Sequence, residues 1–256
     1  MTRGKIALLH LEIRPGAIVQ NRYLLVEAIK HAASIGAEWI VTPELSVCGL
    51  QFVQHAGTAW IQSQPDPWMQ QVCKLVRTLK QTVFLGCPER EDRRFYNSVF
   101  VIGPTGEIVG HHRKINVVSD SLAWSSSGDR VAPIECDGIK VGVLICSDAY
   151  TPNIARVLKF EGAQMLVSPA SWGPGIHGPN GEWEQRSHET RLPLIVCNRT
   201  GSETTLDFRK ATSLVVKDGD RLLSHTSDRS AVLTFDWDFS NMIPSTTHFR
   251  TDYLRS

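Results

Sequence analysis

Three side chains capable of chemistry follow apolar, strand-like segments at well separated points of the chain. Cys146 comes directly after the apolar run 139–145 and opens a turn. Glu44 and Lys114 likewise stand beside short apolar segments. A side chain at the end of a buried strand is held in position and can still face a cleft. A thiol, a carboxylate and an ammonium group together supply what acyl transfer through a thioester requires.

Each residue type has a defined part in such chemistry. A free thiol has a pKa of about 8.5, so Cys146 needs activation before it can act as a nucleophile. Glu44, partly desolvated beside a strand, could accept the thiol proton. Lys114 and the backbone N–H of Ser147 could stabilise the oxyanion of a tetrahedral intermediate. Asp148 could hold the turn or cap the helix that follows. Taken singly, these residues are as typical of solvated loops, so the prediction rests on their combination.

The composition is that of an ordinary globular protein. The 256 residues are 42% hydrophobic and 21% charged, with a net charge of +1, and they suit one domain spanning 1–256. No basic block suggests a nucleic-acid partner. The first apolar run, 6–10, is much shorter than the roughly 20 residues of a membrane span, and it is too short for the core of a signal sequence. We therefore expect a cytoplasmic protein without a membrane partner.

The cysteines and histidines form no pattern typical of a disulfide framework or a metal site. Six cysteines are scattered without a C-x-x-C pair, at positions 48, 73, 87, 136, 146 and 197. This spacing agrees with a reducing compartment. His111 and His112 are adjacent, but neighbouring strand residues point to opposite faces and no third ligand has a recognisable spacing. We expect neither a metal nor another cofactor.

Strand and helix signals alternate along the chain, which predicts an α/β fold. Apolar runs and turn residues indicate strands at 6–10, 39–41, 83–85, 97–102, 107–110, 139–145, 165–167, 194–197, 212–216, 221–223 and 230–235. Helical spacing indicates helices at 21–35, 68–79, 152–161 and 182–192. Thr151 could cap the third helix, and Pro152 suits its first position. Two β-α-β runs, each followed by a hairpin, favour two sheets with helices outside.

The three candidate segments and several others resemble the nitrilase, or carbon–nitrogen hydrolase, superfamily nearly end to end. The similar segments are 42–45, 86–90, 96–98, 103–106, 113–114, 141–148, 169–172 and 196–201. Glu44, Lys114 and Cys146 match the family's Glu–Lys–Cys triad in order, with separations of 70 and 32 residues. The resemblance implies a four-layer αββα sandwich, often doubled by dimerisation. It also implies Glu44 as general base, Lys114 as electrostatic stabiliser and Cys146 as nucleophile.

The chain departs from the family pattern in two places. Many members carry a second glutamate shortly after the lysine, whereas the segment 115–124 has none. Asp120 is the candidate replacement. Ser147 stands where an aromatic residue is usual, and nitrile-cleaving members typically have tryptophan and glutamate where this chain has Ser147 and Asp148. We therefore expect hydrolysis of a small amide or ureido compound, with release of ammonia. The alternatives are a nitrilase and a binding protein that has lost turnover.

Residues at other predicted strand ends are candidates for binding the substrate. Ser171 and Trp172 precede the Gly/Pro-rich loop 173–181, where Trp172 could equally pack in the core. Glu89 could bind a substrate amine or form a structural salt bridge. Arg199 could bind a substrate carboxylate. Further contributions to the pocket are expected from His177, from Asn198 and from loops 52–66, 115–130 and 172–181. Separately, we expect a homodimer or higher homo-oligomer, in which the tail after Phe239 could reach across to the partner.

Overall fold

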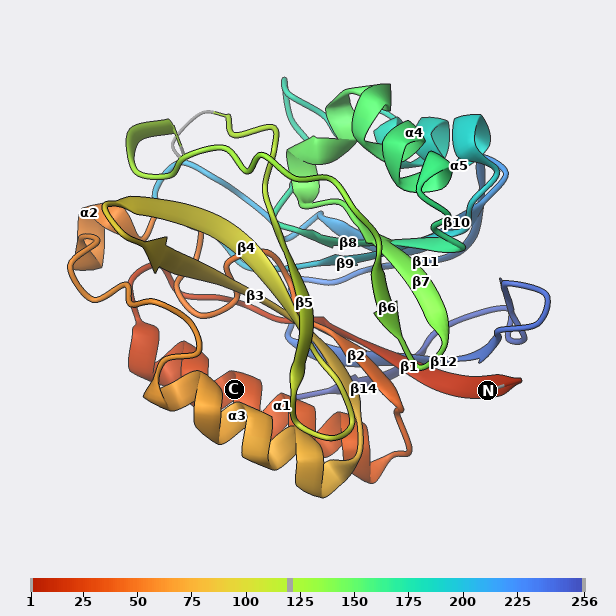
Figure 1. The fold of residues 1–256 in the computed structure, drawn as a ribbon, viewed down its shortest axis with the longest axis horizontal. Coiled ribbons are helices and arrows are strands. Elements are labelled where there is room, and N and C mark those ends of the chain that lie inside the picture. Colours follow the sequence, from red (N-terminus) through yellow and green to blue (C-terminus); the bar gives the residue numbers. More distant parts are fainter. Residues whose placement is uncertain (1, 119–121, 255–256) are drawn as a thin grey trace.

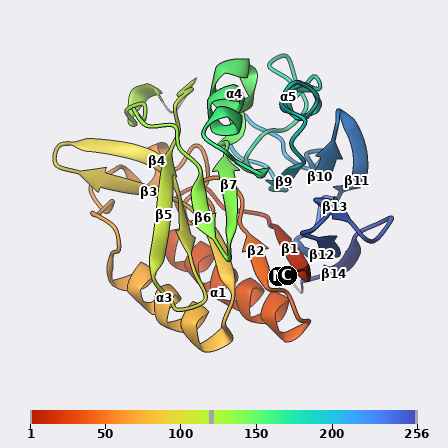
Figure 2. The ribbon, with the colours of Figure 1, turned by 45° about the vertical axis from the view of Figure 1, so that its right-hand side comes forward.

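The computed structural model describes residues 2–118 and 122–254, which form two β-sheets packed face to face between two pairs of helices (Figure 1). The first sheet has the order β13-β12-β1-β2-β3-β4-β5, and β14 also pairs with β12. The second sheet has the order β11-β10-β9-β8-β7-β6. Helices α1 and α3 cover the first sheet, and α4 and α5 cover the second (Figures 1 and 2). The predicted four-layer αββα arrangement is confirmed.

The first sheet is built mainly by the first half of the chain. Its elements are β1 (Arg3–His10), α1 (Ile18–Ser34), β2 (Trp39–Val41), α2 (Val53–Ala56), α3 (Pro67–Leu79), β3 (Thr82–Glu91), β4 (Arg94–Ile102) and β5 (Ile108–Arg113). Strands β1, β2 and β3 are parallel, and β3, β4 and β5 form an antiparallel meander. Strands β2 and β5 therefore run in the same direction, which brings Glu44 and Lys114 to the same edge of the sheet.

The second sheet repeats this construction. Its elements are β6 (Ile134–Cys136), β7 (Ile139–Val143), the 3₁₀ helix η2 (Cys146–Tyr150), α4 (Pro152–Phe160), β8 (Met165–Ala170), α5 (Glu182–Thr190), β9 (Leu194–Asn198), β10 (Thr212–Lys217) and β11 (Asp220–Thr226). Strands β7, β8 and β9 are parallel. Parallel strands end at one edge, so Cys146 and Ser171 lie close together there.

The chain returns to the first sheet at its C-terminal end. Strand β12 (Ala231–Asp238) pairs with β1 along its length, and β13 (Ile243–Pro244) and β14 (Arg250–Tyr253) pair with the other side of β12 (Figure 2). The described part of the segment after Phe239 thus packs on its own sheet. No hydropathy pattern had indicated these two short strands, and the homodimer that the tail could reach across stays a prediction.

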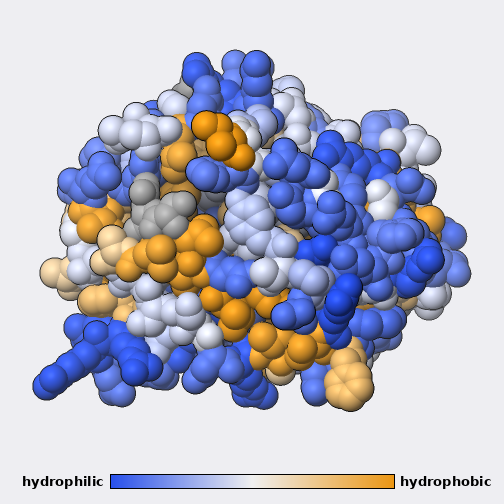
Figure 3. All heavy atoms as spheres, turned by 90° about the horizontal axis from the view of Figure 1, so that it is seen from above, coloured by the Kyte–Doolittle hydropathy of each residue, from blue (hydrophilic) through white to orange (hydrophobic). Residues whose placement is uncertain are grey.

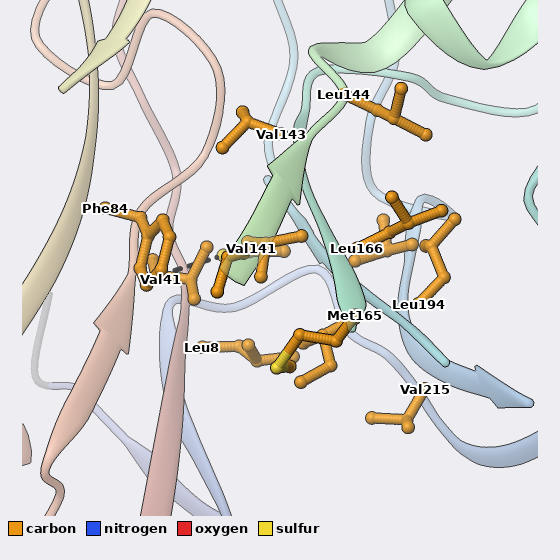
Figure 4. Close-up of a cluster of buried hydrophobic side chains, with 14 of the residues drawn as sticks. Leu8, Val41, Phe84, Val141, Val143, Leu144, Met165, Leu166, Leu194 and Val215 are labelled. Atoms are coloured by element: carbon orange, nitrogen blue, oxygen red, sulfur yellow. Dashed lines mark hydrogen bonds between the residues drawn. The ribbon is translucent and has the colours of Figure 1, made fainter. Parts of the chain in front are cut away.

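Alternating side chains of the central strands fill two separate cores. Leu8, Val41 and Phe84 point into the space between the sheets, where they meet residues of the second sheet such as Val141 and Met165 (Figure 4). The neighbours of these residues along the strands point the other way and pack against α1 and α3; they include Ala7, Leu9, Ile40, Val83 and Leu85. Both faces of the central strands are therefore buried, which explains their continuous apolar runs.

Several element boundaries differ from those predicted. Helix α1 begins at Ile18, before the predicted start at residue 21. Ala17 precedes it and provides no capping side chain that a sequence pattern could reveal. Strand β7 ends at Val143, so Cys146 opens the helix η2 instead of a simple turn. Thr151 occupies the predicted N-cap position of α4 but makes no side-chain cap; its hydroxyl accepts a hydrogen bond from Asn116 Nδ2 at 3.0 Å.

Candidate active site

Glu44, Lys114 and Cys146 line one cavity of about 560 Å³ at the edge where the parallel strands end. Other lining residues come from the ends of β7 and β8 and from three loops: Leu50, Val118, Ser147, Tyr150, Ser171, Trp172, Gly173, Pro174, Gly175, Ile176, His177, Gly178, Thr205, Leu206, Asp207 and Phe208. The structure thus brings together the three side chains that the sequence separates by 102 residues.

Glu44 and Lys114 form a buried ion pair. Lys114 Nζ donates to Glu44 Oε1 at 2.6 Å, and the two side chains are 2% and 0% exposed. Asn97 Nδ2 donates to the same oxygen at 2.8 Å, and the N–H of Ser171 donates to Oε2 at 3.1 Å. Burial lowers the pKa of Lys114, but the negative charge of Glu44 and the hydrogen bond to it raise the pKa, and the net value lies above the usual range. Lys114 is therefore a permanent cation.

Cys146 is held in a backbone conformation that side chains rarely adopt. Its φ is +48°, in the left-handed region, and it begins η2 directly after an extended residue. Such strain is retained only where the surrounding structure enforces it, and it is common at functional sites. The thiol lies 3.9 Å from the carbonyl oxygen of Ser171.

The resting site holds Cys146 as a thiol. Burial raises the pKa of Cys146 well above its usual value, and the charge of Glu44 raises it further, whereas Lys114 lowers it. The net pKa is high, so the thiolate is scarce near neutral pH. A nucleophilic role for Cys146 would therefore require a nearby group that accepts the thiol proton, and Glu44 is the carboxylate whose charge acts on the thiol.

Asp148 holds the turn that carries Cys146. Its Oδ1 accepts the N–H groups of Ile115 at 3.0 Å and Asn116 at 2.8 Å, and its Oδ2 accepts the N–H of Ile145 at 2.9 Å. His112 Nε2 lies 2.9 Å from the same Oδ2. One buried carboxylate therefore joins the segment after β5, which carries Lys114, to the start of η2. The expectation that Asp148 holds the turn agrees with this arrangement.

Replacement of Asp148 by alanine is expected to destabilise the fold by about 3 kcal/mol, because it leaves several buried N–H groups without an acceptor. The free energy of unfolding in urea measures this change. Asp220→Ala is the matched control, because Asp220 is exposed at the start of β11. The control should stay within about 0.5 kcal/mol of the original protein. Equal effects of the two substitutions would contradict the role given to Asp148.

Ser147 joins the same two segments. Its hydroxyl donates to the carbonyl oxygen of Asn116 at 2.7 Å, and Asn116 Nδ2 donates to the carbonyl oxygen of Ser147 at 3.2 Å. The N–H of Ser147 lies in the first turn of η2, where amide groups have no partner within the helix. The small side chain of Ser147 thus binds the neighbouring loop, and the residue also lines the cavity.

Ser171 contacts Glu44, and Trp172 forms part of the cavity wall. Besides its amide, Ser171 contributes a hydroxyl that donates to the carbonyl oxygen of Glu44 at 3.0 Å. Trp172 lines the cavity and also packs edge-to-face against Tyr150 and Trp183, with centroid distances of 4.7 and 5.0 Å. The two roles weighed for Trp172, lining and packing, occur together.

The side chain of Asn198 fixes the backbone of Trp172. Its Oδ1 accepts the Trp172 N–H at 3.0 Å, and its Nδ2 donates to the Trp172 carbonyl oxygen at 2.9 Å. Trp172 Nε1 and the Tyr150 hydroxyl both donate to the carbonyl oxygen of His177. These contacts position the Gly/Pro-rich loop, and His177 takes part through its backbone.

Arg199 and Glu89 do not belong to the described lining of the cavity, which corrects their assignment to substrate binding. Arg199 is fully buried and bound to Glu203, and it also donates to the carbonyl oxygen of Ile13. Glu89 accepts Ser98 Oγ at 2.6 Å and Arg113 Nε at 2.7 Å. The structural salt bridge, which was the alternative for Glu89, is the arrangement that the structure shows.

Some sequence predictions for the site do not correspond to the described cavity, and some residues of the site were not predicted. Asp120, the candidate replacement for the second glutamate, lies outside the described residues. Asn97, which contacts Glu44, lies in a segment that resembles the superfamily but was not singled out. The wall formed by residues 205–208 carries no strand or motif signal, so no pattern could have indicated it. Loop 52–66 does not contribute to the described lining.

Within 2–118 and 122–254, no group of three or more His, Cys, Asp or Glu side chains is arranged to hold a metal ion. His112, the better placed of the two adjacent histidines, is bonded to Asp148 instead. Across the same residues, none of the helices combines the length and apolar character that crossing a bilayer requires.

Comparisons with known proteins agree with this fold. Residues 5–245 match the family described as carbon-nitrogen hydrolase, and the chain belongs to that family. It is 30% identical over 203 residues to an (R)-stereoselective amidase of Pseudomonas sp., covering 77% of this chain and 72% of that protein. It is 25% identical over 268 residues to a citrullinase of Francisella tularensis, covering 94% and 91%.

Solved structures share the fold at low sequence identity. An amidase from Nesterenkonia sp. AN1 superposes with a TM-score of 0.81 at 21% identity, covering 94% of this chain and 92% of that one. That structure is of a mutant and shows covalent addition of the acetamide moiety of fluoroacetamide at the active site cysteine. The prediction of a nitrilase-superfamily member is confirmed.

Proposed function

We propose that the protein is a thiol amidase that cleaves a small amide or ureido compound and releases ammonia. The observation that carries the proposal is the Glu44–Lys114 ion pair, 2.6 Å long and buried, in the same cavity as Cys146. Burial of two charges is costly unless they are paired, so such a pair beside a strained cysteine is more consistent with catalysis than with stability. The amidases among the relatives support the same reaction class.

The proposed reaction begins with attack of Cys146 Sγ on the amide carbonyl carbon while Glu44 takes the thiol proton. The carbonyl oxygen becomes an oxyanion, which Lys114 and the N–H of Ser147 stabilise. The tetrahedral intermediate collapses as protonated Glu44 gives its proton to the leaving nitrogen, and ammonia departs. Water then attacks the thioester with Glu44 as base, which releases the acid and restores the thiol. No proton or electron is left unaccounted for in the cycle.

The test is a measurement of ammonia release over a panel of amides and ureido compounds, combined with intact-protein mass spectrometry. During turnover of a slow substrate, we expect a mass increase equal to the acyl group, located on Cys146 by peptide mapping. Hydroxylamine should remove the adduct, because it cleaves thioesters. Ammonia release without any acyl adduct on Cys146, or no release from any compound of the panel, would argue against the proposal.

Replacement of Gly173 by alanine is expected to weaken substrate binding about tenfold, since small misplacements in a site cost this much or more. A Cβ at this position would overlap the backbone carbonyl of Asp207, which cannot move aside as a flexible side chain could. The loop 205–208 would have to shift away from the cavity. The KM for an amide measures the change.

Gly175→Ala is the matched control for this substitution. A Cβ on Gly175 has no heavy atom within 4 Å, although Gly175 belongs to the same loop and lines the same cavity. The control should therefore retain the original KM. If the two substitutions raised the KM equally, contact between Gly173 and the wall 205–208 would not be important for binding.

A further inference from the structure

The described wall of the cavity is largely apolar outside the candidate catalytic residues, with Asp207 as its one further charged side chain among the described lining residues. Its apolar and aromatic lining residues are Leu50, Val118, Tyr150, Trp172, Ile176, Leu206 and Phe208. Among the described lining residues outside the catalytic centre, Thr205 and His177 contribute neutral polar side chains. A wall of this kind favours ligands that bring apolar surface to it.

The charges that line the described cavity are already paired. Lys114 is bonded to Glu44. Asp207 is bonded to Arg209, whose Nε and Nη2 donate to it at 3.0 and 2.7 Å, and these hydrogen bonds lower the pKa of Asp207 to about 2. Among the described lining residues, His177 is the one further side chain that could become cationic. Among these described lining residues, a ligand carboxylate would therefore meet two carboxylates and no uncommitted permanent cation.

The apolar wall is also held rigidly. Glu203 accepts hydrogen bonds from the N–H groups of Leu50 at 2.9 Å and Gln51 at 2.6 Å. Arg199 forms an ion pair with the same carboxylate. Gln51 Nε2 donates to Thr205 Oγ1 at 2.6 Å, and the Thr205 N–H donates to Gln51 Oε1 at 3.1 Å. The segments around Leu50 and Leu206 are thus locked together. Arg199 is used in this lock, so it is not available to a ligand.

The residues at the mouth of the cavity also include exposed hydrophobic side chains. A second hollow of about 360 Å³ shares Val118, Tyr150, Ile176 and His177 with the first, so these residues lie between the two. Val118 is 37% exposed and Ile176 is 96% exposed. On the face shown in Figure 3, hydrophobic residues form a band across an otherwise largely hydrophilic surface. An apolar chain that extends beyond the first cavity would remain in contact with hydrophobic side chains.

We infer that the site, acting as the proposed amidase, selects amides whose acyl chain is uncharged and apolar and rejects those that carry an anionic end. An anion in this cavity would lose its hydration without gaining a charged partner. Carbamoyl amino acids and half-amides of dicarboxylic acids are therefore excluded, although a citrullinase is among the relatives. This narrows the proposed substrates to neutral amides and neutral ureas with an apolar substituent.

Matched pairs of compounds test the inference. 5-Methylhexanamide and glutaramate have the same shape, with an isopropyl group in place of a carboxylate, and 3-methylbutylurea and N-carbamoyl-β-alanine form the corresponding ureido pair. Ammonia release should show a kcat/KM about a hundredfold higher for the neutral member of a pair, since an unpaired buried charge is strongly disfavoured. Equal or better turnover of the anionic member would overturn the inference and leave the proposed amidase intact.

A substitution in the wall should reduce this preference. Leu206 lines the cavity and is half-buried, so Leu206→Lys should place a cation against the ligand, and Leu206→Gln is the neutral control of similar length. The lysine variant should gain at least about tenfold for glutaramate relative to 5-methylhexanamide, because a charged pair replaces an unpaired anion. The glutamine variant should not. A similar gain in both variants would contradict the electrostatic explanation.

Equilibrium binding keeps the inference independent of turnover. Calorimetric titration of the Cys146→Ala protein with the same four compounds should show binding of the neutral members and at least about tenfold weaker binding of the anionic members. If no compound releases ammonia with the original protein but this binding preference is observed, the proposed function fails and the inference about the pocket stands. Preferential binding of the anionic compounds would end the inference.

Discussion

Replacing Cys146 by alanine is expected to abolish ammonia release, with a loss of at least about 10⁴-fold in kcat, because removal of a nucleophile eliminates the covalent route. The remaining groups cannot compensate. In the proposed reaction Lys114 stabilises a charge that develops only when a bond to the carbonyl carbon forms, and the variant lacks the sulfur that forms this bond. Single-turnover assays with a large excess of enzyme set the limit of detection for the variant.

The fold should be nearly unaffected by this substitution. The Cys146 side chain lines a cavity, so its loss leaves no new void in the core, and alanine experiences the same backbone strain as cysteine. The midpoint of thermal unfolding should therefore remain close to that of the original protein. Cys73→Ala is the control: Cys73 is partly exposed on α3, far from the cavity lining, and its replacement should leave turnover unchanged. Substantial turnover by the Cys146 variant would exclude a thioester route.

The three candidate catalytic residues could be predicted because each is fixed by a local pattern. Glu44 and Cys146 follow largely buried strands that lie parallel to their neighbours, and Lys114 follows the last strand of a meander. An apolar run with a charged or nucleophilic residue at its end is visible in the sequence. The common direction of β2, β5 and β7 then brings those ends together, which the resemblance to the superfamily had implied.

The pocket could not be predicted, because long-range hydrogen bonds form it. The pairing of Glu203 with the backbone of Leu50 and Gln51 spans about 150 residues and has no periodicity that a sequence would reveal. Arg199 was assigned to a ligand because it follows a strand end, yet the fold places a carboxylate beside it. A strand end predicts where a side chain stands, but it does not predict which partner the side chain binds.

Replacing Glu44 by glutamine should lower kcat by about 10³-fold, since general acid–base catalysis contributes about this much. The same substitution should make Cys146 more reactive towards iodoacetamide. The Glu44 charge raises the pKa of the Cys146 thiol and the Lys114 charge lowers it, so loss of the carboxylate lowers the thiol pKa. At pH 7.5 the alkylation rate should rise at least about tenfold, because each unit of pKa changes the thiolate fraction tenfold.

Lys114→Met is expected to change the alkylation rate of Cys146 in the opposite direction, which completes the test. Loss of the cation leaves Glu44 beside the thiol, which raises the thiol pKa further, so alkylation should become slower than in the original protein while turnover is again lost. In the original protein the high thiol pKa predicts an alkylation rate that increases through pH 9 without a plateau. Two inactive variants with opposite alkylation rates cannot result from simple unfolding, which would expose Cys146 and accelerate alkylation in both. If both variants shift alkylation in the same direction, the electrostatic roles of Glu44 and Lys114 are wrong.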